Sequence, residues 1–524
     1  MKPGEIAHSV TRGAFYLAIE KLVALVSGIL YFALLLRWLG PTKYGIMTLA
    51  LSFAGLATMV NGNAEVYLER FAAEYQTNDR LGSLRRAHLL ALFLKSVLGA
   101  FAALLLVLLA PWLARHFEMP ELAVLLPPLA ALVLADGCAT TARATLFGLQ
   151  QFRWVSGLAI VFHVAKTVMV GSLWWMRQGL EGLAVGLAVL SVVQALGASL
   201  VPLALLAGKR DHDGAVPGIR ELWRSMIGYC APLLGARATF MSGQNLGKVV
   251  LGKLFDAESL GYFSFAFQTV ERFVEVIYVL PSSLLPSLTK LVARQERERL
   301  RWIFDQAFRL IQITAVVLAL GLWLFAHEVT LFVGSPLFEK AVPLLRILCL
   351  VPIARTAQQP LTMLFQAMRK PGTVLWLALL KFGIEFGCYF TLIPLVGLAG
   401  AGWANLLGAV AAYLAALAAT RRLLPEGASD RQQAMMRSAG LVFATLALGL
   451  VVQLAIPGWP GLGVRIVLFV ALLPAAFALG LVTRYDLDKL ASVPVRPAWL
   501  HRLRGEAVGA AHRMALALEP RSSR

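Results

Sequence analysis

The feature of this sequence that most constrains its fold is a succession of apolar runs, each roughly 20 residues long and bounded by charged residues, Pro or Gly. A helix of that length crosses the hydrocarbon core of a bilayer, where every backbone N–H and C=O group needs a partner within the protein. A mean hydropathy of +0.72 with only 15% charged residues indicates that the whole chain has the composition of a membrane-spanning protein. The sequence therefore predicts an all-α polytopic membrane protein.

The apolar runs number about 14 when they are counted between their polar boundaries. Their predicted extents are 14–36, 44–66, 88–112, 122–147, 154–176, 180–207, 226–252, 260–285, 303–326, 341–366, 373–395, 398–420, 436–456 and 462–483. The net charge of +19 comes from Lys and Arg in the loops, where positive-inside bias expects them, and it does not indicate a nucleic-acid partner. The loops after even-numbered runs are the basic ones, so both termini are predicted to be cytoplasmic.

An internal repeat gives the chain its predicted organisation. RWLGPTKYGIMTLA at 37–50 aligns without gaps on KLFDAESLGYFSFA at 253–266, which places Gly45 on Gly261, and two later patches match at nearly the same offset. The repeating unit has six spans, so its two copies share one orientation and relate by an axis along the membrane normal. We expect lobes at 1–210 and 211–425, a helix pair at 426–483 and a basic tail at 484–524. The tail is expected to be an amphipathic helix on the anionic inner leaflet or a solvated end.

Charged residues inside the apolar runs are the candidate functional residues, because each is costly in a bilayer and has to face a bundle interior or a watery cavity. They are densest in the predicted hairpin at 227–290. The candidates for binding an anionic substrate are Lys21, Lys166, Arg237, Lys248, Arg272, Arg355 and Lys381. The candidates for coupling to an ion gradient are Glu20, Glu65, Asp136, Glu271, Glu275 and Glu385. Lys95 and Arg143 are further cations within the runs.

Each of these charges also has a structural interpretation. Lys381 and Glu385 lie four residues apart, a spacing that suits an ion pair within one helix. Glu271 and Glu275 share a helix face with Arg272 close by, so these charges can neutralise one another. Snorkelling to an interface is the alternative for a single cation, and uptake of Na⁺ or a proton is the functional alternative for a carboxylate.

Motifs of enzymatic chemistry are not found in the sequence. No His pair has metal-ligand spacing, no Gly-rich loop precedes a Lys and a Ser or Thr, and no nucleophile elbow occurs. The four cysteines each stand alone in an apolar run. We therefore expect a transporter that has no metal and no resident cofactor.

The pattern resembles the oligosaccharide flippases of the multidrug/oligosaccharidyl-lipid/polysaccharide (MOP) exporter superfamily, in its Wzx-type polysaccharide biosynthesis branch. The residues that carry the resemblance are LLLRWLGPTKYGIMTLALSF at 34–53, its copy in the second half, and VLPSSLLPSLTKL at 279–291. The resemblance implies two six-helix lobes around a cavity bordered by spans 1, 2, 7 and 8. It also implies an undecaprenyl-pyrophosphate-linked oligosaccharide as cargo, a bacterial inner membrane, alternating access, and polysaccharide polymerase and chain-length proteins as partners.

Four rival functions stay open at this stage. One is a membrane enzyme such as a polymerase or acyltransferase, which would need a sizeable outward loop or a buried catalytic His. The related lipid II flippases carry an Arg-Asp pair in the first span, which YFALLLRWLG at 31–40 lacks. A drug/cation antiporter of the same fold favours an anion-rich cavity, whereas cations outnumber carboxylates in these runs. NDRLGSLRR at 78–86 is similar to a loop signature of major facilitator transporters, but Ser83 replaces an expected Arg and the extra span pair follows both halves. We predict a flippase that serves export of O-antigen, capsule or exopolysaccharide.

Overall fold

The computed structural model describes residues 3–209, 211, 218–277, 284–368, 370–424, 428–456 and 459–481. The predicted basic tail at 484–524 and residues 279–283 of the Pro-punctuated motif lie outside these ranges. Every regular element in the described ranges is a helix. Contacts between residues divide the chain into unit 1, Met1–Phe265 with Leu331–Lys340, and unit 2, Ala266–Thr330 with Ala341–Arg524.

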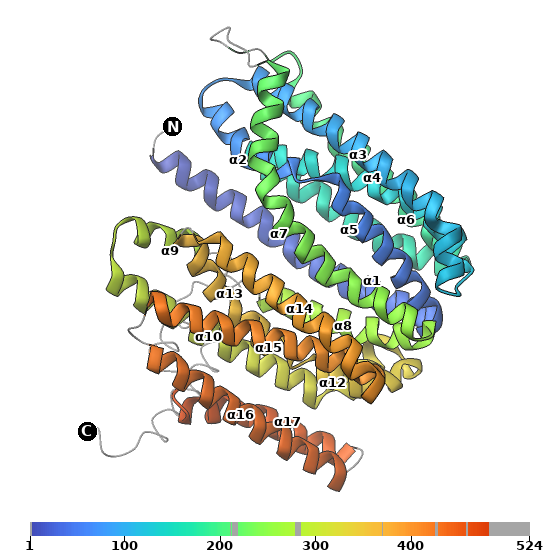
Figure 1. Cartoon of the computed structure of the whole chain (residues 1–524), viewed down its shortest axis with the longest axis vertical. Helices are drawn as coiled ribbons and strands as arrows, with labels where there is room; N and C mark the ends of the chain where they lie inside the picture. The colour runs from blue at the N-terminus through green and yellow to red at the C-terminus, as the bar shows by residue number, and fades with distance from the viewer. Residues whose placement is uncertain are drawn as a thin grey trace. The chain divides into compact units, whose positions relative to one another are not determined.

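Unit 1 is built around α4, which packs most extensively against α3 and α6, while α1 runs along α5 (Figure 1). These helices are rich in Ala, Leu and Val, and α4 buries Leu, Ala and Gly along its length, so the neighbouring helices approach closely. The elements are α1 (Pro3–Ala57), a 3₁₀ turn (Thr58–Asn61), α2 (Ala64–Thr77), α3 (Leu81–His116), α4 (Glu121–Gly148), α5 (Phe152–Trp175), α6 (Leu180–Leu206), α7 (Ile219–Leu254) and the first part of α8 (Ala257–Ile277).

Helix α1 holds the first two predicted spans in one kinked helix. The kink lies at Gly40, whose φ of 66° disfavours residues with a Cβ, and Pro41 follows it without a backbone N–H to donate. The second span ends near Gly62, which has a φ of 71°, and α2 then starts at Ala64. Glu65 therefore lies in the first turn of the amphipathic α2 and not at the end of an apolar span.

Two equivalent glycines of the predicted repeat form a reciprocal close crossing in unit 1. A Cβ at Gly45 of α1 would overlap the carbonyl oxygen of Ala257, and a Cβ at Gly261 of α8 would overlap the carbonyl oxygen of Pro41. Pro41 and Ala257 are also equivalent in the alignment of 37–50 on 253–266. Only glycine lets two helix backbones approach this closely. The two close approaches are therefore reciprocal between residues that the alignment pairs.

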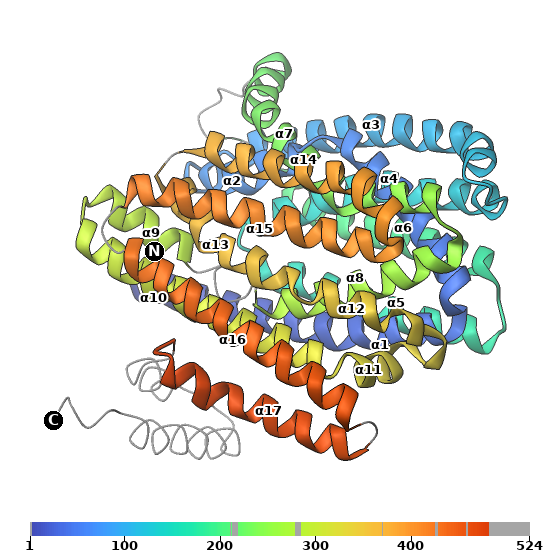
Figure 2. The same ribbon diagram turned by 60° about the horizontal axis from the view of Figure 1, so that its bottom comes forward.

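Unit 2 contains an antiparallel pair, α14 and α15, against which α13 packs. Helices α16 and α17 lie side by side and contact α10 through a buried cluster that includes Val316, Leu441 and Leu472 (Figure 2). The elements of unit 2 are the end of α8, α9 (Leu284–Ala293), α10 (Arg297–Leu324), α11 (Ala326–Val329), α12 (Val342–Leu348), α13 (Val351–Ala367), α14 (Pro371–Val396), α15 (Leu398–Leu423), α16 (Ala428–Ala455) and α17 (Trp459–Ala478).

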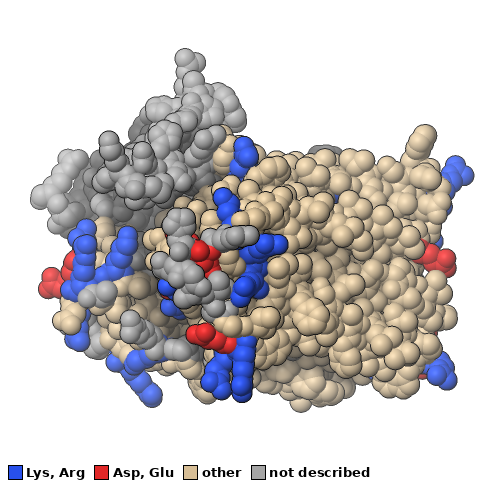
Figure 3. Space-filling model, turned by 90° about the horizontal axis from the view of Figure 1, so that it is seen from above, with Lys and Arg blue, Asp and Glu red and all other residues tan. Residues whose placement is uncertain are grey.

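Ten helical segments in the described ranges are long and apolar enough to cross a membrane, fewer than the predicted fourteen. Spans 1 and 2 form one continuous segment, Phe15–Asn61. Span 10 is divided between α12 and α13, and spans 7 and 8 correspond to the more polar α7 and α8. A broad face without charge, with Lys and Arg toward its margins, is typical of a surface in contact with lipid (Figure 3). The protein is a multi-pass membrane protein.

Candidate functional site

The most deeply buried cation of the described chain lies at the junction of three helices in unit 1. Lys95 of α3 has no exposed surface, and its Nζ lies 2.6 Å from Oε2 of Glu65 in α2. The same Nζ donates a hydrogen bond of 2.8 Å to Oγ1 of Thr140 in α4. A buried ammonium group is stable only with such partners, because desolvation of an unpaired charge costs several kcal/mol.

A second ion pair lies on the same face of α4. Arg143 is three residues after Thr140, and its Nη2 lies 2.7 Å from Oε1 of Glu20 in α1. Ser156 of α5 donates a hydrogen bond of 3.1 Å to the other oxygen of Glu20, whose side chain is almost fully buried. Because residues three apart on a helix are neighbours, α4 connects the two pairs.

A cavity of about 320 Å³ opens beside these pairs, between α4, α5 and α6. Asp136, Thr140 and Arg143 contribute the polar wall from α4, and Ser191 and Gln194 contribute polar groups from α6. The predicted residue Asp136 therefore lies one helical turn from Thr140 and faces the same cavity as Arg143. The cavity places this charged face of α4 next to space that a small ion or water molecules can fill.

Glu69 of α2 extends the cluster and was not among the predicted residues. Partial burial raises the pKa of Glu69, neighbouring Glu65 raises it further, and Arg143 lowers it. Glu65 and Glu69 are four apart on α2, so their like charges repel. Among the described residues of this cluster there are four carboxylates, on Glu20, Glu65, Glu69 and Asp136, and two cations, Lys95 and Arg143. The signal that could have identified Glu69 is its position four residues after Glu65, with the apolar residues Val66, Tyr67 and Leu68 between them.

The predicted residues of unit 2 form ion pairs in which cations and carboxylates balance. Arg355 of α13 pairs with Glu271 of α8. Arg272, the residue after Glu271, pairs with Glu275 one turn farther along α8, with 3.2 Å between Nη1 and the carboxylate.

The pair of Lys381 and Glu385 within α14 confirms the predicted intrahelical contact, at 2.7 Å. Tyr389 donates a hydrogen bond of 3.0 Å to Glu385, and Asn405 of α15 donates one of 2.9 Å to the hydroxyl of Tyr389. The network ties the buried carboxylate of Glu385 to both helices of the α14–α15 pair.

The remaining predicted residues are placed separately. Lys21 is exposed on α1, although Glu20 beside it is buried. Lys166 of α5 lies over the ring of Tyr31, with 4.3 Å between Nζ and the ring centroid. Lys248 is buried on α7. Arg237 belongs to α7, but its side chain lies outside the part of the structure that is described.

Arg272, Arg355 and Lys381 each form an ion pair with a carboxylate, as expected if these charges neutralise one another. Their roles in transport stay predictions. Within the described ranges, no group of three His, Cys, Asp or Glu side chains could hold a metal ion.

Comparisons with known proteins bear on both the fold and the family. The model of a family described as "Polysaccharide biosynthesis protein" matches residues 10–292, more than half of the chain. A second model, MatE, matches residues 232–390. Among curated proteins, none matches the sequence.

Two solved structures show the same fold. One is described as lipid II flippase MurJ in an inward closed conformation, with a TM-score of 0.65, 12% identity, and coverage of 88% of this chain and 98% of that chain. The other is an inward-facing multidrug resistance MATE transporter of the MOP superfamily, with a TM-score of 0.61, 15% identity, and coverage of 80% and 95%. At these identities the likeness shows the fold alone.

Proposed function

Because the chain belongs to the polysaccharide biosynthesis protein family of the MOP superfamily, we propose that it is a flippase for an undecaprenyl-pyrophosphate-linked oligosaccharide in the bacterial inner membrane. Members of this superfamily are membrane transporters, and the protein is not an enzyme. The family match over residues 10–292 is the observation that carries the proposal. It also removes the major facilitator alternative suggested by NDRLGSLRR at 78–86.

The proposed architecture is fourteen spans in two six-helix lobes, 1–210 and 211–425, followed by a helix pair at 426–483. The reciprocal crossing of Gly45 and Gly261 supports the repeat, because equivalent residues of two copies make equivalent contacts. Each of the fourteen predicted runs also overlaps a helix, with runs 1 and 2 sharing α1 and run 10 divided between α12 and α13. Both termini are proposed to be cytoplasmic, in agreement with the basic loops after even-numbered spans.

The cargo is proposed to bind through its pyrophosphate, for which Arg and Lys side chains are suitable ligands. The proposed ligands are Lys21, Lys166, Arg237, Lys248, Arg272, Arg355 and Lys381. Since Arg355 and Arg272 are paired with Glu271 and Glu275, the pyrophosphate has to displace a carboxylate or join the pair. Exchange of one anionic partner for another keeps each guanidinium neutralised throughout the cycle.

The acid-rich cluster of unit 1 is the proposed coupling site. Glu20, Glu65, Glu69 and Asp136 are the proposed carriers of a proton or Na⁺. Uptake by Glu65 would weaken its hold on Lys95, uptake by Glu20 would weaken its hold on Arg143, and either would loosen the junction of α1, α2, α3 and α4. This provides a physical link between an ion gradient and helix packing. The carboxylates of unit 2, Glu271, Glu275 and Glu385, are proposed to act there as exchangeable partners.

A second candidate function is a multidrug/cation antiporter of the same fold, which the four carboxylates among the described residues of the unit 1 cluster favour. Expression in a strain that lacks its own O-antigen flippase distinguishes the two. Restored surface polysaccharide with unchanged drug resistance supports the flippase. Raised drug resistance without surface polysaccharide supports the antiporter, and a lipid II flippase would instead rescue peptidoglycan synthesis.

A further inference from the structure

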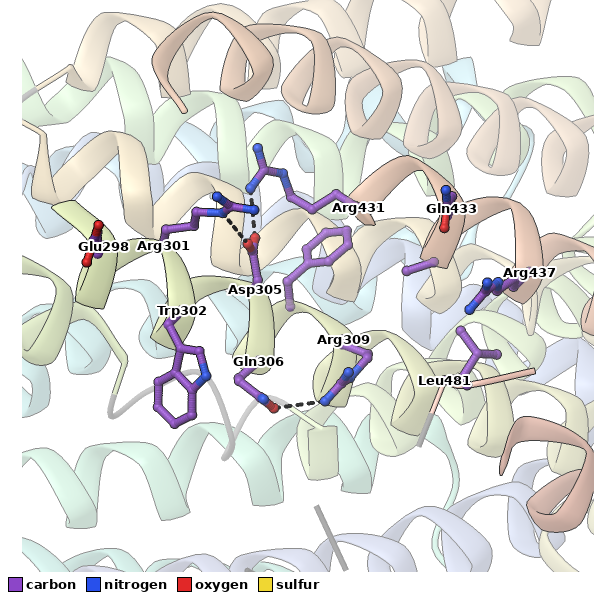
Figure 4. A pocket seen from close by; sticks show the side chains of 13 residues that line it. Glu298, Arg301, Trp302, Asp305, Gln306, Arg309, Arg431, Gln433, Arg437 and Leu481 are labelled. Atoms are coloured by element: carbon purple, nitrogen blue, oxygen red, sulfur yellow. Dashed lines mark hydrogen bonds and ion pairs between the residues drawn. The ribbon is translucent and has the colours of Figure 1, made fainter. Parts of the chain in front are cut away.

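The described part of the chain forms further cavities apart from the candidate site. The larger of two, about 620 Å³, lies where α10 and α16 begin, and there Arg301 and Arg431 converge on the carboxylate of Asp305 (Figure 4). This shared carboxylate joins α10 to α16, so its ion pairs serve the packing of unit 2. The other cavity, about 560 Å³, lies in unit 1 and has a different kind of wall.

The wall of the unit 1 cavity combines indole rings with cationic side chains. It contains three tryptophans, one lysine, one arginine and one glutamine. Among its described residues there is no Asp or Glu, and there is no Leu, Ile, Val or Phe. The wall consists of Trp38 and Lys43 of α1 and of Gly171, Trp174, Trp175, Arg177 and Gln178 at the end of α5. It therefore offers flat apolar faces and hydrogen-bond donors side by side.

The turn that ends α5 places four of these side chains together. Arg177 has a φ of 53°, in the left-handed region that commonly ends a helix. Its N–H group donates a hydrogen bond of 3.0 Å to the carbonyl oxygen of Trp174. The N–H group of Gln178 donates one of 3.0 Å to the carbonyl oxygen of Leu173. These bonds fold the backbone of Arg177 and Gln178 against the last turn of the helix, next to Trp174 and Trp175.

The kink of α1 supplies the other part of the wall. Trp38 lies before the kink at Gly40 and Lys43 lies after it, so both sides of the kink contribute. Helix α1 packs along α5, and the kink of α1 meets the end of α5 at the cavity. These two places follow predicted spans 1 and 5, and the loops after odd-numbered spans are predicted to lie outside. The cavity is therefore at the outer end of unit 1 in the proposed topology.

The chemistry of this wall suits a sugar that carries a carboxylate. The C–H face of a sugar ring is apolar and stacks on an indole ring, while its hydroxyl groups can accept hydrogen bonds from Gln178 and from indole N–H groups. The guanidinium fork of Arg177 matches the two oxygens of a carboxylate, and Lys43 adds a second positive charge. Because Lys43, Arg177 and Gln178 are exposed, a glycan reaches them from the water phase.

A phospholipid matches the wall less well. Its phosphate would use the two cations but not the three indole rings, and its acyl chains need aliphatic side chains, which the described residues of the wall do not include. Exposed tryptophan also anchors proteins at the membrane interface, which accounts for Trp174 and Trp175 singly. It does not account for their grouping with Trp38, Lys43 and Arg177 around one cavity, whose volume is in the range of ligand pockets.

We propose that this cavity receives an acidic sugar of the cargo on the outer side of the membrane, with Arg177 and Lys43 on the carboxylate and the indole rings on the face of the sugar. The inference rests on the proposed function and names the class of glycan, an oligosaccharide that contains a uronic acid. Because exposed charge pairs are weak, the site releases the glycan after translocation.

Binding of soluble tetrasaccharides to the full-length protein in phosphatidylcholine nanodiscs, measured by microscale thermophoresis, tests the proposal. The probes are a hyaluronan tetrasaccharide, which contains glucuronic acid, and chitotetraose, which is neutral. We expect wild type to bind the acidic probe roughly fivefold or more tightly than the neutral probe, and Lys43→Gln/Arg177→Asn to lose that preference. Asn replaces Arg177 because it tolerates the left-handed conformation. No binding, equal affinities in wild type, or an unchanged preference in the double variant would overturn the site.

Residues of α3 outside the cavity provide the matched controls. Arg115→Gln removes an exposed cation, Trp112→Ala removes a tryptophan that is 52% exposed, and both variants should bind as wild type. Trp175→Ala, at a residue that is 89% exposed, should weaken binding of both probes by roughly threefold or more, because stacking does not depend on charge. Unchanged affinities in Trp175→Ala, or a loss of preference in Arg115→Gln as large as in the double variant, would contradict the site.

A last arm separates the glycan from a lipid and the inference from the proposed function. Excess glycerophosphoglycerol, the soluble headgroup of phosphatidylglycerol, should leave the acidic tetrasaccharide bound, and displacement would assign the cavity to a phospholipid and overturn the proposal. Binding of the tetrasaccharide does not require it to cross the membrane. Translocation of the cargo without binding of the acidic probe would therefore remove this inference alone, whereas binding without translocation would remove the proposed function.

Discussion

The ammonium group of Lys95, without exposed surface, lies 2.6 Å from the carboxylate of Glu65, and the two residues come from adjacent helices of unit 1. Removal of one partner takes this ion pair from the other buried charge, which costs about 3 kcal/mol or more in such pairs. Lys95→Met should therefore lower the thermal unfolding temperature in detergent sharply, and Glu65→Gln should do so as well. The double variant Lys95→Met/Glu65→Gln should recover much of the loss. Additive losses in the double variant would show that the two residues are not energetically coupled.

The crossing of α1 and α8 at Gly45 and Gly261 gives a prediction about side-chain size. Gly45→Val and Gly261→Val should each destabilise the protein by several kcal/mol, because backbone carbonyl groups occupy the space of the new side chain. Gly171→Val is a matched control on α5, where an added Cβ would meet no described atom within 4 Å apart from its chain neighbours and the adjacent backbone of its own helix. Size-exclusion profiles and unfolding temperatures of the three variants measure the effect. Wild-type behaviour of Gly45→Val would contradict the crossing.

Asp211 gives a prediction about pH. Burial acts to raise the pKa of Asp211, but hydrogen bonds from Ser83 and Gly82 and the charge of Arg80 outweigh it and lower the pKa. A lowered folded-state pKa contributes stability above the unfolded value of about 3.9, and this stability is lost as pH falls through the folded pKa.

The check is the unfolding temperature of Asp211→Asn relative to wild type. We expect the variant to be less stable at pH 7, by less than about 1 kcal/mol because the group is partly exposed. The difference should shrink below pH 4 as Asp211 takes up a proton. A difference that is constant between pH 7 and pH 3 would contradict the charge-dependent role of Asp211.

The sequence could predict the features that depend on local spacing. The apolar runs located the helices, the alignment of 37–50 on 253–266 paired the two glycines that meet at the crossing, and the spacing of Lys381 and Glu385 predicted their ion pair. The kink at Gly40 was not predicted. A short, less apolar stretch between two apolar runs has the same hydropathy whether it forms a turn between two helices or a kink within one helix.

Contacts between distant segments could not be predicted from one sequence. Arg143 and Glu20 are 123 residues apart, and Arg355 and Glu271 are 84 apart, so no periodicity connects them. The predicted cations were therefore treated as substrate ligands without their partners, whereas the structure pairs several of them with carboxylates of their own unit. Glu69 was not predicted because the second span was expected to end at residue 66, and α2 was not recognised as a separate helix.

The coupling proposal predicts a selective loss of gradient dependence. Glu65→Gln and Glu69→Gln should reduce transport driven by an imposed proton or Na⁺ gradient at least tenfold, while cargo binding persists, because a neutral amide cannot accept a proton and lacks the negative charge that attracts Na⁺. Proteoliposomes with and without the gradient provide the comparison. If transport by both variants responds to the gradient as it does in wild type, the coupling site lies elsewhere.

The central claim is that the protein moves a lipid-linked oligosaccharide by means of basic residues, and a flipping assay in proteoliposomes tests it most directly. Undecaprenyl-pyrophosphate-linked oligosaccharide is placed in the membrane, and its appearance in the opposite leaflet is measured with a glycan-modifying enzyme that cannot cross. We predict translocation by wild type and by Arg153→Gln, an exposed control on α5, and loss of translocation in Arg237→Gln/Arg272→Gln with normal protein levels. Translocation by the double variant at the wild-type rate, or none by wild type, would contradict the account.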